Sequence, residues 1–405
     1  MTYYPSQQIL ERYADVLINF ALNSGKGVKK GEVVRITATE SGKPLYLQLR
    51  KAVLKAGAHP MGNFLPDDDA IIMPTRDFYN LASEEQLNFF PKKYIKGLVE
   101  QIDHTVSVIS THNKHVLQGI DPKKIMTVSK AMKPFTDWLF DKENKGKFTW
   151  TVGLFGTPEM AKEAELDLEQ YWKQIIDGCF LNDPNPIAKW RQVSNNIEKI
   201  RTKLNQLKID RVHVLGIDVD LWLTIGKKRL WNGGSGRNIP SFEIFTSPDW
   251  RETQGWIKFS QPLYIFGNLI KNVELEFKNG RVVKSKASKN ENVLKEMIAQ
   301  KNADKVGEFS LTDGRFSHIT KFMAETLYDE NVGGPQGNTH IALGRSYHDC
   351  FDGDPSKLNK NEWAKLGYNN SAIHTDIVST TNRKVTAYLA NGVEKIIYKD
   401  GVFSV

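Results

Sequence analysis

The sequence predicts two domains: an N-terminal α/β domain, with a parallel sheet and flanking helices, and a strand-rich α+β C-terminal domain. Three observations support this fold class. The 405 residues exceed the size at which one hydrophobic core stops growing. Strand-like and helix-like segments alternate in the first half, whereas short strand-like segments dominate the second. Between the halves, the prolines of Asn182–Pro186 favour an irregular connection, which divides the chain into residues 1–185 and 186–405.

The first half has the strand–helix–strand rhythm of a parallel sheet. Apolar side chains recur at helical spacing from Ile9 to Ala21 and predict the first helix. Pro44 suits the first turn of a second helix, and Gly57 stops that helix. The remaining elements expected here are a strand at Val33–Ala38, a helix at Leu45–Ala56, strands at Thr105–Ser110 and Thr149–Phe155, and a helix at Pro158–Cys179.

The second half opens with a helix expected at Ile187–Leu207 and then changes to strands. The strands are expected at Arg211–Ile217, Leu221–Ile225, Trp256–Phe259, Val273–Phe277 and Val282–Ser285. Two Asn-Gly pairs, at Gly280 and Gly392, predict hairpin turns, because this dipeptide supplies the positive φ that such turns require.

Composition excludes several classes of protein. Lys plus Arg is 55 and Asp plus Glu is 47, which gives a formal charge of +8, but the lysines are scattered among acids. A nucleic-acid-binding role therefore depends on net charge alone, and we expect no nucleic-acid partner. No apolar run approaches the roughly 20 residues of a membrane span. Two cysteines and a start without a basic and then apolar stretch predict a cytoplasmic protein with neither disulfide framework nor signal peptide.

Two carboxylates of the second half have unusual neighbours. Glu243 lies among apolar residues between two prolines, in the segment Asn238–Asp249. Glu308 follows Gly307 and precedes a strand-like Phe-Ser-Leu. Either residue taken alone is more simply an exposed acid at a strand end or a turn.

Two further segments are harder to dismiss. A glycine-rich loop separates an acidic triplet, which contains Glu330, from His340 at the start of an apolar run. Glycines let the backbone approach a compact site closely. Farther on, His374 and Asp376 are two residues apart, so an extended chain places both side chains on one face.

Together these acids and imidazoles offer more donors than the four that a structural zinc ion requires. They suit a hydrolytic site with two metal ions that share a bridging carboxylate. Nitrogen and oxygen ligands without sulfur favour Zn, Co or Mn. Two such cations would make hydroxide available near neutral pH.

The order and wording of these segments resemble the metallo-aminopeptidase family of aminopeptidases T and S over nearly the whole chain. In the first half, the segments that carry the resemblance are Leu10–Ala14 and Lys55–Ala58. In the second half, they are Asn238–Thr246, Gly307-Glu308, Leu327–Asn331, His340–Gly344, Tyr347 and His374–Asp376. They occur in the family order. The resemblance implies an N-terminal α/β domain, a C-terminal catalytic domain, a homodimer, and removal of N-terminal amino acids from peptides with a free N-terminus.

The resemblance also assigns roles to individual residues. It makes Glu308 a bridging ligand and Tyr347 an active-site tyrosine, which suits hydrogen bonding to the oxygen that gains charge during peptide cleavage. The full set of implied metal ligands is Glu243, Glu308, His340, His374 and Asp376, with Glu330 as a further acidic position. The glycine-rich loop Val332–Thr339 is longer than in the family, which either reshapes the substrate pocket or moves Glu330 away from the metal.

Other functions remain open from the sequence. One is a metal-dependent amidase that acts on a non-peptide substrate, and another is a peptide-binding homologue without catalysis. Cys350 lies near two histidines in sequence, which leaves a cysteine hydrolase as a minor alternative. His112 and His115 are three residues apart, but we interpret them as a solvated surface pair. His348 has no assigned role.

Overall fold

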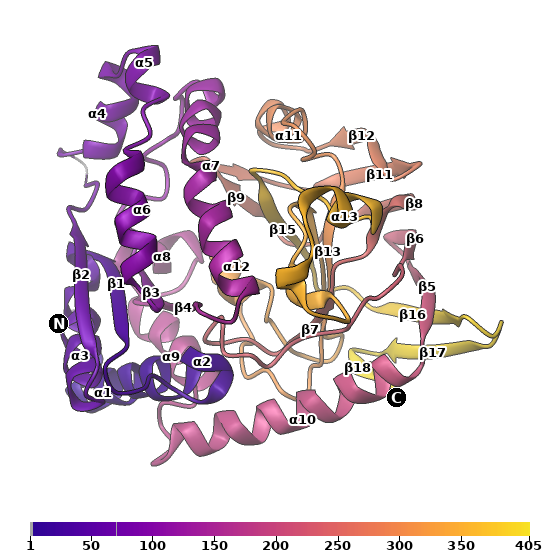
Figure 1. The fold of residues 1–405 in the computed structure, drawn as a ribbon, viewed down its shortest axis with the longest axis horizontal. Coiled ribbons are helices and arrows are strands. Elements are labelled where there is room, and N and C mark those ends of the chain that lie inside the picture. The colour runs from indigo at the N-terminus through magenta and orange to yellow at the C-terminus, as the bar shows by residue number, and fades with distance from the viewer. Residues whose placement is uncertain (1–2, 70) are drawn as a thin grey trace. The chain divides into compact units, whose positions relative to one another are not determined.

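The computed structural model describes residues 3–69 and 71–405, and Figure 1 shows its elements. The chain forms two compact units. Unit 1 comprises Met1–Ser194, Gly234–Ser241 and Met323–Glu325; unit 2 comprises Asn195–Gly233, Phe242–Phe322 and Thr326–Val405. The division falls inside helix α10 (Pro186–Gln206), whereas the boundary expected from the sequence lies at the start of that helix.

Unit 1 is built on a four-stranded parallel sheet with the order β2-β1-β3-β4. Its strands are β1 (Val33–Thr39), β2 (His59–Leu65), β3 (His104–Ile109) and β4 (Thr149–Leu154). Helix α3 (Lys43–Lys55) packs against β1 and β2. Elsewhere, Val33, Trp150 and Leu139 of α7 (Pro122–Asn144) pack against a buried cluster that contains Leu98 of α6 (Lys92–Gln101). The parallel sheet with flanking helices is therefore confirmed.

Unit 1 contains helices in the expected ranges and further helices, α4 to α7, that the sequence analysis did not predict. The first predicted helix, Ile9–Ala21, corresponds to α1 (Gln7–Val16) and a π-helical turn (Leu17–Ala21), which the short α2 (Leu22–Gly25) follows. The other helices are α4 (Pro74–Leu81), α5 (Glu84–Leu87), α6 (Lys92–Gln101), α7 (Pro122–Asn144), α8 (Pro158–Glu163) and α9 (Leu168–Gly178).

The prediction of one helix over Pro158–Cys179 is wrong. The chain leaves the helical conformation after α8, because Glu165 has a φ of 57°. Asp167 then starts α9 by accepting a hydrogen bond from the Gln170 N–H at 2.7 Å, which satisfies a helix-terminal donor. The apolar spacing continues across the break, so periodicity alone does not reveal it.

Unit 2 contains an eight-stranded sheet with the order β12-β11-β8-β6-β5-β16-β17-β18, in which neighbouring strands are antiparallel. Its strands are β5 (Ile209–Gly216), β6 (Val219–Thr224), β8 (Asp249–Lys258), β11 (Glu274–Lys278), β12 (Arg281–Lys286), β16 (Arg383–Leu389), β17 (Glu394–Lys399) and β18 (Val402–Phe403). Positive φ angles at Asn279 and Gly280 form the predicted turn between β11 and β12, and Gly392 lies in the hairpin between β16 and β17.

A second antiparallel sheet of unit 2 has the order β15-β14-β13-β7. Its strands are β7 (Glu243–Thr246), β13 (Val306–Thr312), β14 (Asn338–Gly344) and β15 (His374–Ser379). Every residue of β7, β13 and β14 is buried, so polar side chains on these strands have little contact with water. The smaller elements of unit 2 are β9 (Leu263–Ile265), β10 (Asn268–Ile270), α11 (Glu291–Ile298), α12 (Thr326–Asp329) and α13 (Lys360–Lys365).

The strand-rich character of the C-terminal region is thus confirmed. Among the described residues, no helix is both long enough and apolar enough to cross a membrane.

Candidate metal centre

The four-stranded antiparallel sheet of unit 2, β15-β14-β13-β7, carries five of the predicted ligands. Glu243 begins β7 and His374 begins β15. Glu308, His340 and Asp376 are each the third residue of their strands, β13, β14 and β15. Four segments that are far apart in sequence therefore contribute to one sheet.

The pairing register places these side chains on one face. Glu308 lies opposite Ala342, and Ala342 lies opposite Asp376, so the side chains of Glu308 and Asp376 point to the same side. His340 and His374 lie two residues before Ala342 and Asp376, and a step of two residues keeps the same face. The predicted common face for His374 and Asp376 follows directly from β15.

Glu243 and Glu330 complete the cluster. Glu243 pairs with Thr312, which lies four residues beyond Glu308 in β13 and so on the same face. Glu330 is not on the sheet but directly follows α12. Ligand atoms of three groups lie within 4.8 Å of one another: Glu243, Glu308 and His340; Glu308, His374 and Asp376; Glu330, His340 and Asp376.

Glu308 lies between the two imidazoles. Its Oε1 is 3.3 Å from Nε2 of His340, and its Oε2 is 3.6 Å from Nε2 of His374. Asp376 Oδ1 is 3.7 Å and 3.4 Å from the same two nitrogens. Each oxygen of Glu308 thus faces a different histidine, an arrangement that suits a carboxylate shared by two cations.

The donor atoms fit bound cations. His340 Nδ1 and Asp376 Oδ1 are buried, and neither has a hydrogen-bond partner within residues 3–69 and 71–405. Buried polar atoms without partners are uncommon in native proteins and suggest a missing ion or water. Four carboxylates and two imidazoles without thiolates match hard or borderline divalent cations.

Burial and mutual repulsion perturb the carboxylates. Burial, opposed by His340 and reinforced by Glu308 and Asp376, raises the pKa of Glu243 to about 7. Burial also raises the pKa of Glu330 well above its usual value, and the neighbouring carboxylates, Glu243 first among them, add to this effect. In contrast, the pKa of Asp376 falls to about 2, because its interactions with His374 and His340 outweigh its burial.

The imidazoles respond in the opposite direction. Burial lowers the pKa of His340, but Glu308, Glu243 and Asp376 together outweigh it and raise the pKa to about 9. The pKa of His374 also rises to about 9: Asp376 and Glu308 outweigh burial there, and the Arg345 carbonyl accepts a hydrogen bond from Nδ1 at 2.8 Å. Without cations, the cluster therefore holds protons near neutral pH.

Comparison with known proteins identifies the family. The model of the family described as thermophilic metalloprotease (M29) matches residues 6–403. The chain belongs to the M29 metalloprotease family. Among curated relatives, aminopeptidase AmpS of Bacillus subtilis is 26% identical over 415 residues, which cover 97% of this chain and 98% of that protein. Aminopeptidase T of Thermus thermophilus is 25% identical over 387 residues, 91% of each chain.

A solved structure agrees with the fold of this M29 chain. Wild-type AmpT from Thermus thermophilus matches with a TM-score of 0.82 at 23% identity, covering 98% of this chain and all of that one. The fold class expected from the sequence is therefore confirmed over both units.

Tyr347 lies beside the cluster of the M29 protein. Its ring meets the His374 ring edge-on, with centroids 4.7 Å apart, and also approaches the Phe245 ring at 6.0 Å. Its backbone N–H donates to Ser247 Oγ at 2.8 Å, which fixes the start of the turn that follows β14. The half-buried side chain is close enough to the imidazole to contribute to the same site.

The sequence analysis did not assign a role to Asn331, although it lies in the quoted Leu327–Asn331 segment. Its side chain is fully buried and donates to Glu243 Oε1 at 3.0 Å. A polar amide directly after the acidic residues Asp329 and Glu330 is the signal that could have identified it.

The loop Val332–Thr339 does not carry Glu330 out of the cluster, because Glu330 still groups with His340 and Asp376. Backbone hydrogen bonds hold the loop: Gly333 N donates to Ile319 O at 2.9 Å, and Asn338 N donates to Tyr398 Oη at 3.2 Å.

The residues considered for other roles take structural positions. The His348 ring stacks on the Trp363 ring at 3.8 Å and 3°, within a small apolar cluster. Cys350 has 0% of its surface exposed, so it presents no nucleophile to a substrate. Neither it nor Cys179 forms a disulfide.

His112 and His115 are partly exposed, in keeping with the solvated surface pair expected from the sequence, and each has a carboxylate neighbour. Each imidazole approaches a glutamate of α8: His112 Nδ1 lies 3.6 Å from Glu159 Oε2, and His115 Nε2 lies 2.9 Å from Glu163 Oε1. The two imidazoles are 36% and 39% exposed, so these contacts contribute little to stability.

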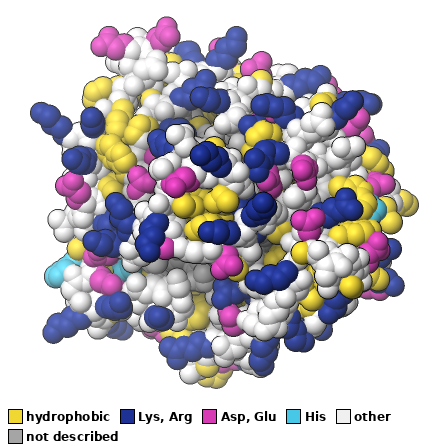
Figure 2. Space-filling model, turned by 45° about the vertical axis from the view of Figure 1, so that its right-hand side comes forward, with side chains coloured by type: hydrophobic (Ala, Val, Ile, Leu, Met, Phe, Trp, Pro, Cys, Tyr) yellow, Lys and Arg dark blue, Asp and Glu magenta, His cyan; other side chains and the backbone are white. Residues whose placement is uncertain are grey.

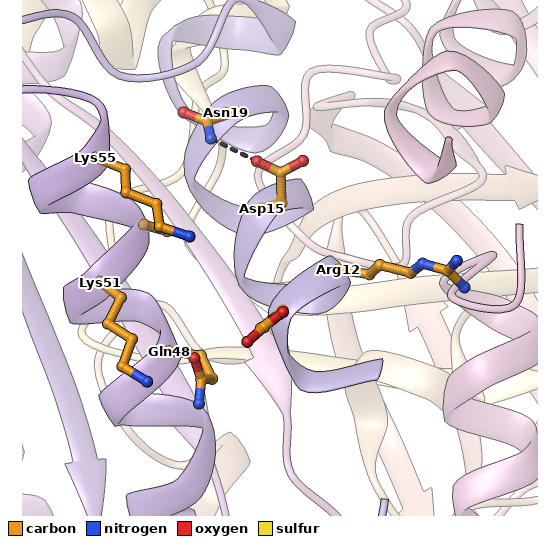
Figure 3. Close-up of a pocket in the computed structure, with 8 residues that line it drawn as sticks. Arg12, Asp15, Asn19, Gln48, Lys51 and Lys55 are labelled. Atoms are coloured by element: carbon orange, nitrogen blue, oxygen red, sulfur yellow. Dashed lines mark hydrogen bonds between the residues drawn. The ribbon is translucent and has the colours of Figure 1, made fainter. Parts of the chain in front are cut away.

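A hollow of about 250 Å³ lies in unit 1, between α1 and α3 (Figure 3). Glu11 and Asp15 of α1 line one wall, and Lys51 and Lys55 of α3 line the other. It contains none of the candidate metal ligands. On the face of the molecule seen in Figure 2, Lys and Arg side chains are dispersed among Asp and Glu, so the positive net charge forms no continuous basic stripe there.

Proposed function

We propose that this chain, a metal-dependent aminopeptidase, uses two divalent cations in unit 2 to cleave peptides at a free N-terminus. The ligands proposed for them are Glu243, Glu308, Glu330, His340, His374 and Asp376. The observation that carries the proposal is Glu308, whose two oxygens lie 3.3 and 3.6 Å from different imidazoles and so suit a bridge between two ions. The mixed nitrogen and oxygen donors suit Zn, Co or Mn.

When bound, the cations would lower the pKa of a shared water and polarise the scissile carbonyl. Tyr347 is proposed to donate a hydrogen bond to the carbonyl oxygen as that oxygen gains negative charge. Its ring contact with His374 places it at the edge of the cluster. A nearby carboxylate that does not ligate a cation is proposed to carry the proton that the leaving amine requires.

The remaining parts of the proposal concern the whole protein. We propose that residues 186–405 form the catalytic domain and residues 1–185 the domain that shapes access. A homodimer is proposed from the family resemblance. A cytoplasmic location is proposed because neither cysteine forms a disulfide.

The proposal is tested with aminoacyl p-nitroanilides and their N-acetylated counterparts. Hydrolysis of the free-amine substrates should disappear on dialysis against a chelator and return with Co, Zn or Mn. The acetylated substrates should resist cleavage, since they lack the free amine. Cleavage that survives chelation, or equal cleavage of both substrate sets, contradicts the proposal. Gel filtration with light scattering tests the dimer.

A further inference from the structure

Asn331 forms hydrogen bonds both to the side chain of Glu243 and to the backbone beside it. Its Nδ2 donates to Glu243 Oε1 at 3.0 Å and to Leu327 O at 3.1 Å, and its Oδ1 accepts from the Phe242 N–H at 2.7 Å. The side chain is fully buried, so water does not compete for these hydrogen bonds. One amide thus contacts both the backbone before Glu243 and the carboxylate itself.

These contacts distinguish the two oxygens of Glu243. Oε1 accepts from Asn331, while Oε2 faces His340 Nε2 at 3.9 Å. We propose that Asn331 is a positioning residue that orients Glu243 so that Oε2 is the atom presented to the metal. This inference rests on the proposed metal centre and extends it beyond the ligands, because outer hydrogen bonds fix the orientation of ligating carboxylates.

The same residue also relates Glu243 to Glu330. Asn331 follows Glu330 in the chain. Its backbone N–H donates a hydrogen bond to Tyr328 O at 2.9 Å, which anchors Asn331 to the end of α12. The Asn331 amide is hydrogen-bonded to Phe242 and Glu243. It therefore links the end of α12 to the start of β7. The Asn331 side chain thus holds the Glu243 carboxylate, and the Glu330 side chain hydrogen-bonds to the same carboxylate.

An amide is well suited to this position. It supplies a donor and an acceptor without charge, as the Glu243 oxygen and the Phe242 N–H require. An aspartate would have nearly the same shape and could still accept from Phe242. It would lose the donor and add a further carboxylate to a cluster that already contains four.

The test compares Asn331→Asp with Asn369→Asp. Asn369 is also buried, but its Nδ2 donates to the backbone oxygens of Asn302, at 2.7 Å, and Gly344, at 2.5 Å, rather than to a ligand. Metal content after dialysis, affinity in a chelator competition, the visible spectrum of the cobalt-loaded protein, and kcat and KM are measured for both. Asn331→Asp should bind one of the two cations about 10–100-fold more weakly and alter the cobalt spectrum. Asn369→Asp also loses buried hydrogen bonds and lowers the stability of the fold, but it should keep the metal affinity and cobalt spectrum of wild type.

A background variant separates positioning from general damage. In Glu243→Gln, the carboxylate on which Asn331 acts is absent, so adding Asn331→Asp should weaken metal binding by less than threefold further. If Asn331→Asp yields no folded protein by circular dichroism, Asn331→Ser removes the donor to Glu243 without adding charge and is measured instead.

The outcomes separate this inference from the proposed function. Wild-type affinity for both cations and an unchanged cobalt spectrum in Asn331→Asp would overturn the positioning role while leaving the metal centre intact. Equal losses in Asn331→Asp and Asn369→Asp would overturn it too, since they would indicate loss of packing. A wild-type protein that binds no cation would overturn both the proposed function and this inference.

Discussion

Metal affinity should rise steeply with pH between 7 and 9. His340 and His374 both have a pKa near 9 without cations, because the surrounding carboxylates stabilise their protonated forms. A metal ion must displace these protons before the imidazoles can bind it. At pH 7, a group with a pKa of about 9 is deprotonated in only about 1% of molecules.

The size of the effect follows from this fraction. A cation that takes one imidazole ligand should gain about tenfold in apparent affinity per pH unit well below the pKa. Between pH 7 and pH 9 the deprotonated fraction rises from about 1% to about 50%, which is a gain of about 50-fold. Above the pKa the curve should flatten. Below pH 7 it should steepen, since Glu243, with a pKa of about 7, must then lose a proton as well.

Isothermal titration calorimetry tests the predicted dependence of metal affinity on pH. Mn²⁺ is titrated into chelator-treated protein at several pH values and in two buffers with different ionisation enthalpies, which gives the affinity and the number of protons released. About one proton per imidazole should be released at pH 7. His374→Gln serves as the matched control and should release fewer protons. An affinity that changes by less than threefold between pH 7 and 9 would refute the reasoning, because ordinary histidines are already deprotonated in that range.

Three further predictions concern individual residues and stability. Glu308→Ala should lose both bound cations, measured by elemental analysis after dialysis, and should also lose peptidase activity. If the variant keeps its cations and its activity, Glu308 is not the bridging ligand. Tyr347→Phe should keep its cations but lose about 10²–10³ in kcat on p-nitroanilides, the usual loss for one oxyanion donor; an unchanged kcat excludes that role. The raised pKa values of His340 and His374 add stability that is complete below about pH 6.5 and lost as the pH rises through about 9. The free energy of unfolding of the metal-free protein, measured in urea, should therefore fall over this range, and a constant or rising value would contradict the assignment.

Local sequence patterns predicted where helices and strands form better than where a helix is interrupted. The β-branched run at Val33–Ala38 became β1, and the Asn-Gly turn at Gly280 formed as expected, because the signal for each lies in a few consecutive residues. The separation of α8 from α9 depends on the φ of Glu165 and the cap at Asp167, which apolar spacing does not report. The return of Gly234–Ser241 to unit 1 depends on contacts distant in sequence and has no local signal.

The candidate site was predictable where spacing within one strand sufficed. His374 and Asp376 share a face because they are two residues apart, a property of any strand. The position of Glu308 opposite Ala342 depends instead on antiparallel register, which a single sequence does not specify. Asn331 was missed for a similar reason: its partner Glu243 lies 88 residues away, and only the fold brings the two together.

Gly307 and Gly344 allow close backbone contacts that fix the orientation of His374. A Cβ on Gly307 would collide with the carbonyl oxygen of Arg345, so only glycine permits this close approach of β13 at the irregular register before Glu308. The same carbonyl accepts the hydrogen bond from His374 Nδ1, which fixes the protonated nitrogen and leaves Nε2 for a metal. Gly344, with a φ of +106°, similarly allows contact with the carbonyl of Ile373, immediately before His374. Glycines beside the ligand motifs thus act on the metal centre through backbone approach, although they carry no donor side chain.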